Sequence, residues 1–348
     1  MHLDVEYVLP LRWSGDVSRR DAGELTDYLR RLSSLVDVTV VDGSDASTFR
    51  RHRDLWSPHV RHLPPEPWPG RNGKVAGVVT GVRRARHERV VLADDDVRYD
   101  AASLRAVVAA LDGGELVRPQ NVFTSWPWHA RWDTGRSLLN RAVSHDHPGT
   151  FGVRRSCFVA MGGYDGDVLF ENLELTRTVA SCGGRVVGLP GVFVGRVPPD
   201  AGHFWSQRVR QAYDDLAQPT RLVLEMSVLP LTLLALRRRP GTVPAGALAA
   251  VLLAEAGRRR AGGASVYPRS AAWWALPWLG ERSLCIWLAL AQLPRGGAPY
   301  AGGRIRRAAT PLRRLRSRTR RPLEGGRNGS GADGVALTPA VHVLETSA

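Results

Sequence analysis

Residues 89–96 read RVVLADDD, a short apolar run that stops at three aspartates. The run of Val and Leu predicts a buried strand, and the acidic triplet predicts the polar loop at its end. In an extended loop Asp94 and Asp96 point the same way, so together they can hold one hard divalent cation, Mn²⁺ or Mg²⁺, which in turn binds a diphosphate. The alternative is a solvated loop whose aspartates cap the next helix.

Strands and helices alternate on both sides of this motif. Expected strands cover residues 4–9, 36–41, 60–63, 89–93 and 115–118; expected helices cover 21–35, 74–86 and 103–111, the last with Asp100 as its N-cap. This alternation predicts an α/β fold with a Rossmann-like, mostly parallel sheet flanked by helices. Ligands of such sheets bind beyond the carboxyl ends of the strands, where both Asp42 and the Asp94–Asp96 triplet fall.

The pattern is less regular after residue 120. Residues 147–156 read as a loop entering a strand, and a helix is expected from near Glu171 to the Gly183-Gly184 pair. Another helix is expected over residues 203–217. We therefore assign residues 1–218 to one catalytic domain.

Beyond Pro219 the composition becomes apolar. Residues 222–236 and 243–256 are apolar stretches that each precede an arginine triplet, and residues 271–293 form a third stretch interrupted by Glu281-Arg282. All are short for a spanning helix, which needs about 20 apolar residues. We expect residues 219–303 to form helices lying in one leaflet of a membrane, with arginines on anionic head groups. The alternative is a helical subdomain packed on the catalytic domain.

The charge is strongly basic, with a formal net charge of +15 and a pI of about 10.9. Nine arginines and no acid occupy residues 304–321, within a segment, 304–348, whose end from Gly325 is expected to be disordered. This run lacks interleaved aromatic residues and follows the apolar stretches, so it favours lipid head groups over nucleic acid. The three cysteines form no CxxC pair, which argues against a disulfide scaffold or a zinc cluster. No secretory signal is visible, so we expect a membrane-associated protein with a cytoplasmic catalytic domain.

Lys74 is the only lysine of the chain and opens an expected helix, where charge and helix N-terminus together can meet a phosphate. Trp68 and Val75 occupy places that a Walker A loop needs for Gly and Ser/Thr, so Asn72-Gly73-Lys74 is not a P-loop. The alternative is an exposed lysine at a helix start. Further on, Trp205, Gln207 and Arg210 lie at helical spacing and could hold a diphosphate or an acceptor, or simply belong to a surface helix.

In order and spacing these motifs resemble glycosyltransferase family 2, whose members have a GT-A fold, over residues 4–217. The matching positions are Pro10 at the end of the first strand, Asp42 after the second, Gly73-Lys74, Asp94 and Asp96 as a DxD motif, Arg154-Arg155, Gly162-Gly163-Tyr164, Glu171-Asn172 at an ED motif, and Gln207 with Arg210 in a QxxRW motif. The resemblance implies that Asp94 and Asp96 bind the metal. It also implies that Pro10, Asp42, Lys74, Asp94 and Asp95 bind the nucleotide-sugar.

Three positions depart from the family pattern. Asn172 stands where the family carries its catalytic base, Gln211 replaces the motif tryptophan, and Arg12-Trp13 occupies a place where an acid is common. An amide cannot accept a proton, so Glu171 and Glu174 at the same helix start are the candidate bases in its place. A phosphate acceptor, which is already ionised, would need no base.

The resemblance implies an inverting, metal-dependent transfer of sugar from a nucleotide-diphosphate sugar, with UDP as the default nucleotide, to a lipid-linked or glycan acceptor at a membrane surface. Two other readings stay open. A non-catalytic GT-A module would bind a nucleotide-sugar or act as a scaffold, which Asn172 favours and the intact Asp triplet opposes. A nucleotidyltransferase would also use paired aspartates and a lysine, but residues 11–15 are not the Gly-rich loop expected there.

Overall fold

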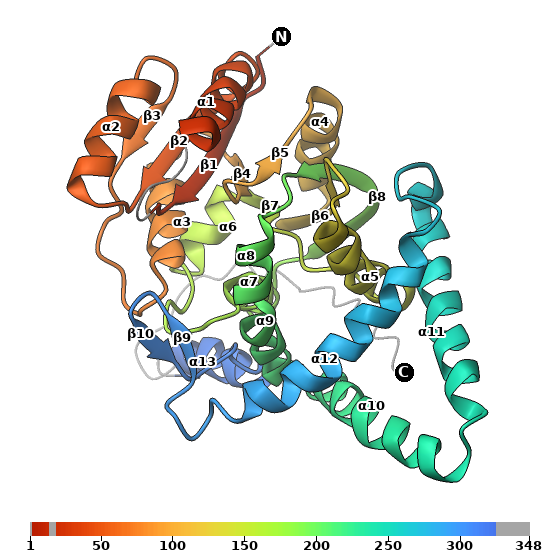
Figure 1. Ribbon diagram of the computed structural model, residues 1–348. Coiled ribbons are helices and arrows are strands. Elements are labelled where there is room, and N and C mark those ends of the chain that lie inside the picture. Colours follow the sequence, from red (N-terminus) through yellow and green to blue (C-terminus); the bar gives the residue numbers. More distant parts are fainter. Residues whose placement is uncertain (1, 14–18, 325–348) are drawn as a thin grey trace.

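The computed structural model describes residues 2–13 and 19–324 (Figure 1). The disorder predicted from Gly325 onward therefore falls outside the described residues. The centre of the molecule is an eight-stranded sheet in the order β3-β2-β1-β4-β7-β6-β8-β5. Its strands are β1 (Val5–Leu11), β2 (Asp37–Asp42), β3 (Arg61–Leu63), β4 (Arg89–Ala93), β5 (Val97–Arg98), β6 (Leu116–Phe123), β7 (Thr150–Arg154) and β8 (Val186–Arg196).

Most of these strands run in one direction. β1 pairs in parallel with β2 and β4, β2 with β3, and β6 with β8. β7 is antiparallel to both β4 and β6, and β5 is antiparallel to β8. The carboxyl ends of β1, β2, β4, β6 and β8 therefore meet at the same edge of the sheet as the amino end of β7. The predicted mostly parallel sheet is confirmed.

Helices cover both faces of the sheet (Figure 1). They are α1 (Arg19–Ser33), α2 (Ala46–Trp56), α3 (Gly73–Arg84), α4 (Ala101–Ala110), α5 (Trp128–Val143), α6 (Arg155–Ala160), α7 (Glu171–Ser181), α8 (Ala201–Ser206) and α9 (Arg208–Asp214). Successive side chains of a strand point to opposite faces. Tyr7 and Leu9 accordingly pack with α1 and α4, whereas Val8 packs with α3, α6 and α7. Burial on both sides explains why the strands read as continuous apolar runs.

Several elements differ from the sequence prediction. β8 was not expected, because Pro190 and three glycines interrupt its apolar pattern; a register irregularity at Pro119/Gln120 accommodates it beside β6. Helix α5 was not expected either, because its buried face carries polar residues such as Asp133 and Arg141. The helix predicted over residues 203–217 is divided into α8 and α9 at Gln207.

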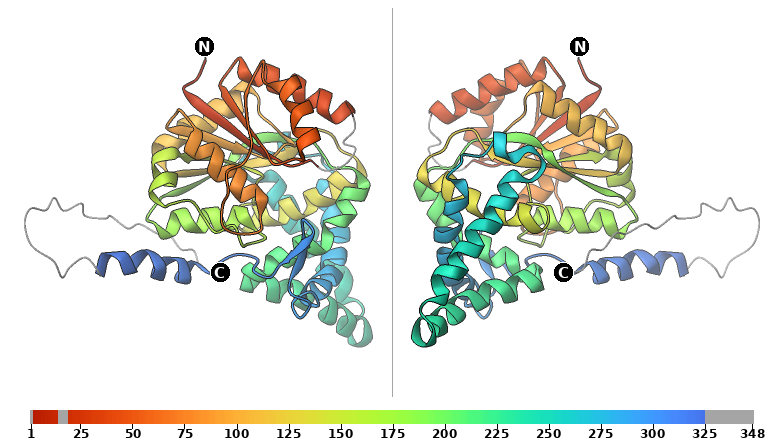
Figure 2. Two further views of the ribbon diagram at one scale, coloured as in Figure 1. Left: turned by 90° about the vertical axis from the view of Figure 1, so that its left-hand side faces the viewer. Right: turned by 90° about the vertical axis from the view of Figure 1, so that its right-hand side faces the viewer.

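The apolar stretches form α10 (Pro219–Arg238), α11 (Thr242–Arg259) and α12 (Ala275–Leu290). α11 and α12 pack against α5, and α12 also packs against α9, so they share buried clusters with residues that precede position 219. The end of α10 and the start of α11 protrude from the molecule (Figures 1 and 2). The alternative of a packed helical subdomain therefore describes α11 and α12. Helix α10 is largely exposed and is the part of this region that remains available to a membrane.

Glu281 and Arg282, which interrupt the third apolar stretch, lie inside one continuous helix. Arg282 is 1% exposed and its Nη1 lies 3.0 Å from Asp215 Oδ2, while Glu281 lies 3.6 Å from Arg208. These charges therefore face the protein interior, which fixes α12 to the catalytic domain.

After α12 the chain forms a hairpin of β9 (Ala298–Tyr300) and β10 (Gly303–Ile305), and then helix α13 (Leu312–Glu324). The first part of the arginine-rich segment packs on the catalytic domain: Arg307 pairs with Asp165 at 2.5 Å, and the Thr310 amide donates to Glu174 Oε2 at 2.6 Å. In α13 the arginines at 313, 314, 316 and 318 are exposed. Most of the exposed arginines among the described residues of this segment therefore lie in α13, and Arg306 is the exposed one before it.

Candidate active site

A cavity of about 1160 Å³ opens at the carboxyl edge of the sheet. Its lining residues come from that edge and from helices that include α7, α9 and α12. Nine of the predicted site residues line it: Pro10, Lys74, Asp94, Asp95, Asp96, Glu171, Asn172, Gln207 and Arg210. The segments that supply them are up to 200 positions apart, and the sheet order and helix packing bring them together.

Each carboxylate of the triplet has its own surroundings. Asp94 Oδ1 contacts Lys74 Nζ at 2.6 Å, and Asp96 Oδ2 contacts Arg196 Nε at 2.7 Å. Asp95 Oδ2 accepts a hydrogen bond of 2.5 Å from the indole of Trp13, at one of the positions that depart from the family pattern. The tryptophan thus fixes the middle carboxylate, while the outer two face the cavity beside cations.

Lys74 joins two acidic groups that are distant in sequence. Its Nζ lies 2.6 Å from Asp94 and 2.7 Å from Glu171 Oε1. Burial lowers the pKa of Lys74, but the two carboxylates outweigh burial and the net shift is upward. Burial raises the pKa of Asp94 to about 6, helped by Asp96 and Glu171 and opposed by Lys74. Lys74 therefore remains charged and holds Asp94 and Glu171 in one cluster.

The triplet has the donors that a hard divalent cation requires. Asp94 and Asp96 present carboxylate oxygens to the same cavity, and Asp96 Oδ1 is buried without a hydrogen-bond partner among the described residues. Gly149 lies against Asp94, where an added Cβ would approach Oδ2 to 2.7 Å. The ligand atoms that Asp94 and Asp96 offer are all oxygens, and one of them lacks a partner among the described residues. Such a set fits Mg²⁺ or Mn²⁺.

The opposite side of the cavity is formed by α9. Arg210 donates to Gln207 Oε1 at 2.9 Å, as expected for residues three apart on a helix, and its guanidinium lies over the Tyr300 ring. Arg210 Nε is buried without a hydrogen-bond partner within the described part of the chain. Gln207 therefore holds the Arg210 guanidinium at the cavity wall. This cation keeps one N–H, at Nε, that no described residue accepts.

A comparison with protein families matches residues 28–213, more than half of the chain, to the family described as "Glycosyltransferase like family 2". The chain belongs to this glycosyltransferase family. Its sheet and helices form the GT-A fold, and it is a glycosyltransferase. Among the curated proteins, no sequence matches the chain.

Solved structures with similar folds include other glycosyltransferases. The mannosyltransferase PcManGT from Pyrobaculum calidifontis, in complex with GDP-Man and Mn²⁺, is 19% identical, with 82% of this chain and 88% of that chain covered and a TM-score of 0.46. GalNAc-T7 with UDP, GalNAc and Mn²⁺ is 14% identical over 57% of this chain and 44% of that chain, with a TM-score of 0.40.

Two other departures from the family pattern, Asn172 and Gln211, also line the cavity. Asn172 lies beside Glu171, and its Nδ2 donates to the Pro148 carbonyl at 3.3 Å. The amide therefore has a structural contact that a carboxylate would not make, since a carboxylate has no N–H to donate.

Three residues proposed for the glycosyltransferase site do not line the cavity. Asp42 is 1% exposed, and its Oδ2 is bound by His52 Nδ1 at 2.7 Å and His62 Nε2 at 3.1 Å. Because both histidines bind this carboxylate inside the protein, the structure does not support direct contact between Asp42 and a base or ribose. Burial would raise the pKa of Asp42, but hydrogen bonds from His52, His62 and Ser44 hold it well below its usual range.

Glu174 and Trp205 are the other two. Glu174 is fully buried and binds the Thr310 amide, so it supports the C-terminal segment and does not offer a base to the cavity. Trp205 is 49% exposed and packs in an aromatic cluster with Trp128, Trp132 and Phe204. Phe204, its neighbour in α8, lines the cavity instead.

We expect Glu171→Gln to lower the rate of sugar transfer about 10²-fold, because the change removes a carboxylate from the cavity wall and leaves Lys74 with one partner. Glu174→Gln should stay within a few-fold of the wild type, since an amide oxygen still accepts the Thr310 N–H. Nucleotide release from the donor measures both rates. Equal losses in the two variants would contradict this assignment.

Sequence reasoning missed much of the cavity wall. Five arginines line it in addition to Arg210 and the exposed Arg12: Arg136, Arg196, Arg208, Arg221 and Arg282. Each is paired with an acid, for example Arg208 with Asp133 at 3.0 Å and Arg221 with Asp215 at 2.9 Å. Arg208 and Asp214 share α9 with Gln207, so helical spacing around the partial QxxRW motif is the signal that could have found them.

Proposed function

We propose that this glycosyltransferase moves a sugar from a nucleotide-diphosphate sugar, with UDP as the first nucleotide to test, to a lipid-linked or glycan acceptor. Transfer proceeds with inversion, in a single displacement at the anomeric carbon, and requires Mn²⁺ or Mg²⁺. The observation that carries this proposal is the pair Asp94 and Asp96 at the carboxyl end of β4. Both line a large cavity, and Asp96 Oδ1 has no hydrogen-bond partner among the described residues.

The charges around the triplet support this role. Asp94 and Asp96 would hold the cation, which neutralises negative charge on the departing diphosphate. Lys74 and Arg210 line the same cavity and add positive charge from two sides. Fixed charges in a partly enclosed site stabilise developing charge without reorganising in the reaction. Pro10 and Asp95 lie at the adjacent strand ends, where the nucleotide would contact the backbone.

Calorimetric titration of the full chain with UDP, and in parallel with GDP, tests the proposal in the presence and absence of manganese. We expect binding that requires manganese for one of the two nucleotides. Binding of neither nucleotide, with or without metal, would contradict a nucleotide-sugar site. Binding with no turnover of any donor would favour a GT-A module that binds nucleotide-sugars without catalysis, a reading that Asn172 also suggests.

We also propose that α10 places the enzyme on a membrane surface, with the catalytic domain on the cytoplasmic side. Among the described helices, α10 is the one that is long and apolar enough to cross a membrane, and only 6% of its apolar window is buried. Exposed apolar side chains occur along it, including Leu224 at 64%, Leu231 at 60% and Leu236 at 52%. Arg237, Arg238 and Arg239 follow at the protruding turn, where anionic head groups would attract them.

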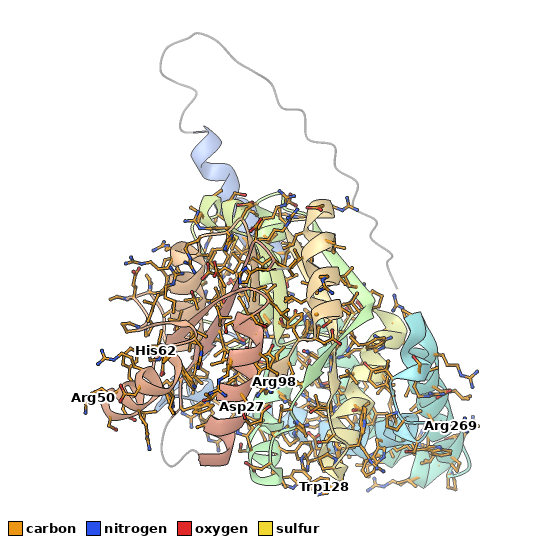
Figure 3. The ribbon with its side chains drawn as sticks, turned by 90° about the horizontal axis from the view of Figure 1, so that it is seen from above. Asp27, Arg50, His62, Arg98, Trp128 and Arg269 are labelled. Atoms are coloured by element: carbon orange, nitrogen blue, oxygen red, sulfur yellow. The ribbon has the colours of Figure 1, made fainter. Side chains whose placement is uncertain are left out.

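We expect the triple change of Arg237, Arg238 and Arg239 to glutamine to weaken binding to phosphatidylserine-containing vesicles by about 10²-fold, at about 1 kcal/mol for each charge. Co-sedimentation with vesicles measures this, and neutral vesicles should show little change. The matched control replaces three exposed arginines of α2, Arg50, Arg51 and Arg53, with glutamine. Arg50 and Arg269 lie at opposite sides of the molecule in Figure 3, with α2 on the side of Arg50 and α11 on the side of Arg269. Equal weakening by both triple changes would leave only a general charge effect and contradict the proposed surface.

A further inference from the structure

Seven carboxylates line the cavity, and most of them already have a partner. Asp94 and Glu171 share Lys74, at 2.6 and 2.7 Å. Asp96 pairs with Arg196 at 2.7 Å, and Asp95 accepts the Trp13 indole N–H. A carboxylate oxygen that already contacts a cation or accepts a hydrogen bond is occupied, and that contact opposes uptake of a further proton.

Two of the other three are paired as well. Glu66 accepts from Arg84 Nε at 2.8 Å, and Asp133 pairs with Arg208 at 3.0 Å. Asp214 is different: within the part of the chain that the structure describes, its side chain makes no ion pair and no hydrogen bond, and its Oδ1 is buried. Buried polar oxygens almost always have a partner, so an orphan at a cavity wall points to a ligand that completes it.

Asp214 ends α9, the helix that carries Arg210 and has Gln207 as its N-cap. It lies four residues after Arg210 and seven after Gln207, so all three share the helix face that lines the cavity. The charged groups that act on it are Arg210 on its own helix, Asp215 after it, Glu171 on α7 and Arg282 on α12, and Tyr300 on β9 lines the same cavity. Glu281, also on α12, lies beside Arg208. Burial raises the pKa of Asp214 to about 8; Glu171 and Asp215 add to this, and Arg210 and Arg282 oppose it.

A hydroxyl acceptor needs a group that takes its proton, and Asn172 at the family's base position cannot do so. We propose that Asp214 is the catalytic base of this enzyme and that the acceptor reacts through a hydroxyl group. This inference rests on the proposed function. The acceptor oxygen forms a bond to the anomeric carbon while its proton passes to the Asp214 carboxylate. The bond from the anomeric carbon to the diphosphate oxygen breaks, and its electron pair leaves with the nucleoside diphosphate.

The same step with water as the acceptor is hydrolysis of the donor, which gives an assay without a known acceptor. UDP-glucose and GDP-mannose serve as probes with manganese, and release of UDP or GDP is followed between about pH 6 and pH 9. We expect the wild-type kcat/KM to rise with pH and level off above about 8, where Asp214 is ionised. Asp214→Asn should lower the plateau by about 10²-fold and remove this pH dependence. Asp214→Glu should restore a pH-dependent rate in part.

Calorimetric binding of UDP with manganese separates this inference from the proposed function. Asp214→Asn should bind UDP as the wild type does, since Asp214 is not a metal ligand. The variant should also be at least as stable: the raised pKa of a buried acid costs stability as pH rises through the folded pKa, and an amide removes that cost. An unchanged rate or pH profile in Asp214→Asn, or no donor hydrolysis by a wild type that binds UDP, would overturn Asp214 as the base. Absence of UDP and GDP binding would instead overturn the proposed function itself.

Discussion

Replacing Asp94 and Asp96 together with asparagine should abolish manganese-dependent UDP binding and lower sugar transfer by about 10³-fold or more. Both carboxylates line one cavity, and Asp96 Oδ1 has no protein partner among the described residues, so the pair is set to receive a cation. Asparagine keeps the size of the side chain but removes two negative charges, and an amide oxygen is a much weaker ligand for a hard cation. Calorimetry with UDP and manganese, alongside nucleotide release from the donor, measures both effects.

The control for this experiment is Asp54→Asn, which removes a charge from an exposed position on α2. It should leave binding and rate unchanged. Circular dichroism should show that the double variant keeps its fold, since Asp94 and Asp96 stand at the mouth of the sheet and not in its apolar clusters. If the double variant kept metal-dependent UDP binding, the cation would have to be held elsewhere and the proposed site would be wrong.

Lys74→Met should cause the second large loss, in both stability and activity. The lysine is the cation between Asp94 and Glu171, and its removal leaves two acids close together in a largely buried setting. Removing one member of a buried ion pair costs about 3–5 kcal/mol; with about a quarter of the lysine side chain exposed, we expect a value near the lower limit. Urea unfolding at neutral pH measures the free-energy change, and the loss should shrink at low pH as the acids become protonated.

A double variant isolates the contribution of the charge. Lys74→Met combined with Glu171→Gln removes one acid together with the lysine, so it should be more stable than Lys74→Met alone. Lys74→Arg, the only conservative change available at this position, should retain most of the stability and part of the activity, because the guanidinium is longer and planar. If Lys74→Met unfolded at the same urea concentration as the wild type, the bridge would contribute no stability.

Local sequence patterns were sufficient for the strands that are buried on both faces. The run at residues 89–93 is β4, and Asp100 caps α4 with Ser103 in a capping box, as its position before an apolar helix predicts. β8 and α5 could not be predicted in this way. Proline and glycines interrupt the apolar pattern of β8. The inner face of α5 carries polar residues, because Asp133 forms a buried ion pair and Arg141 donates hydrogen bonds to backbone carbonyls.

The same distinction holds for the site. The sequence by itself determined the acidic triplet after a buried strand, the sole lysine at a helix start and the ordered motifs of family 2, because these depend on neighbours within a few positions. Only the tertiary structure decided which carboxylates are available. It enclosed Asp42 between two histidines, turned Glu174 toward Thr310 and left Asp214 at the cavity with no partner among the described residues. Burial and ion pairing depend on residues far apart in the chain, such as Lys74 and Glu171, and no local pattern records them.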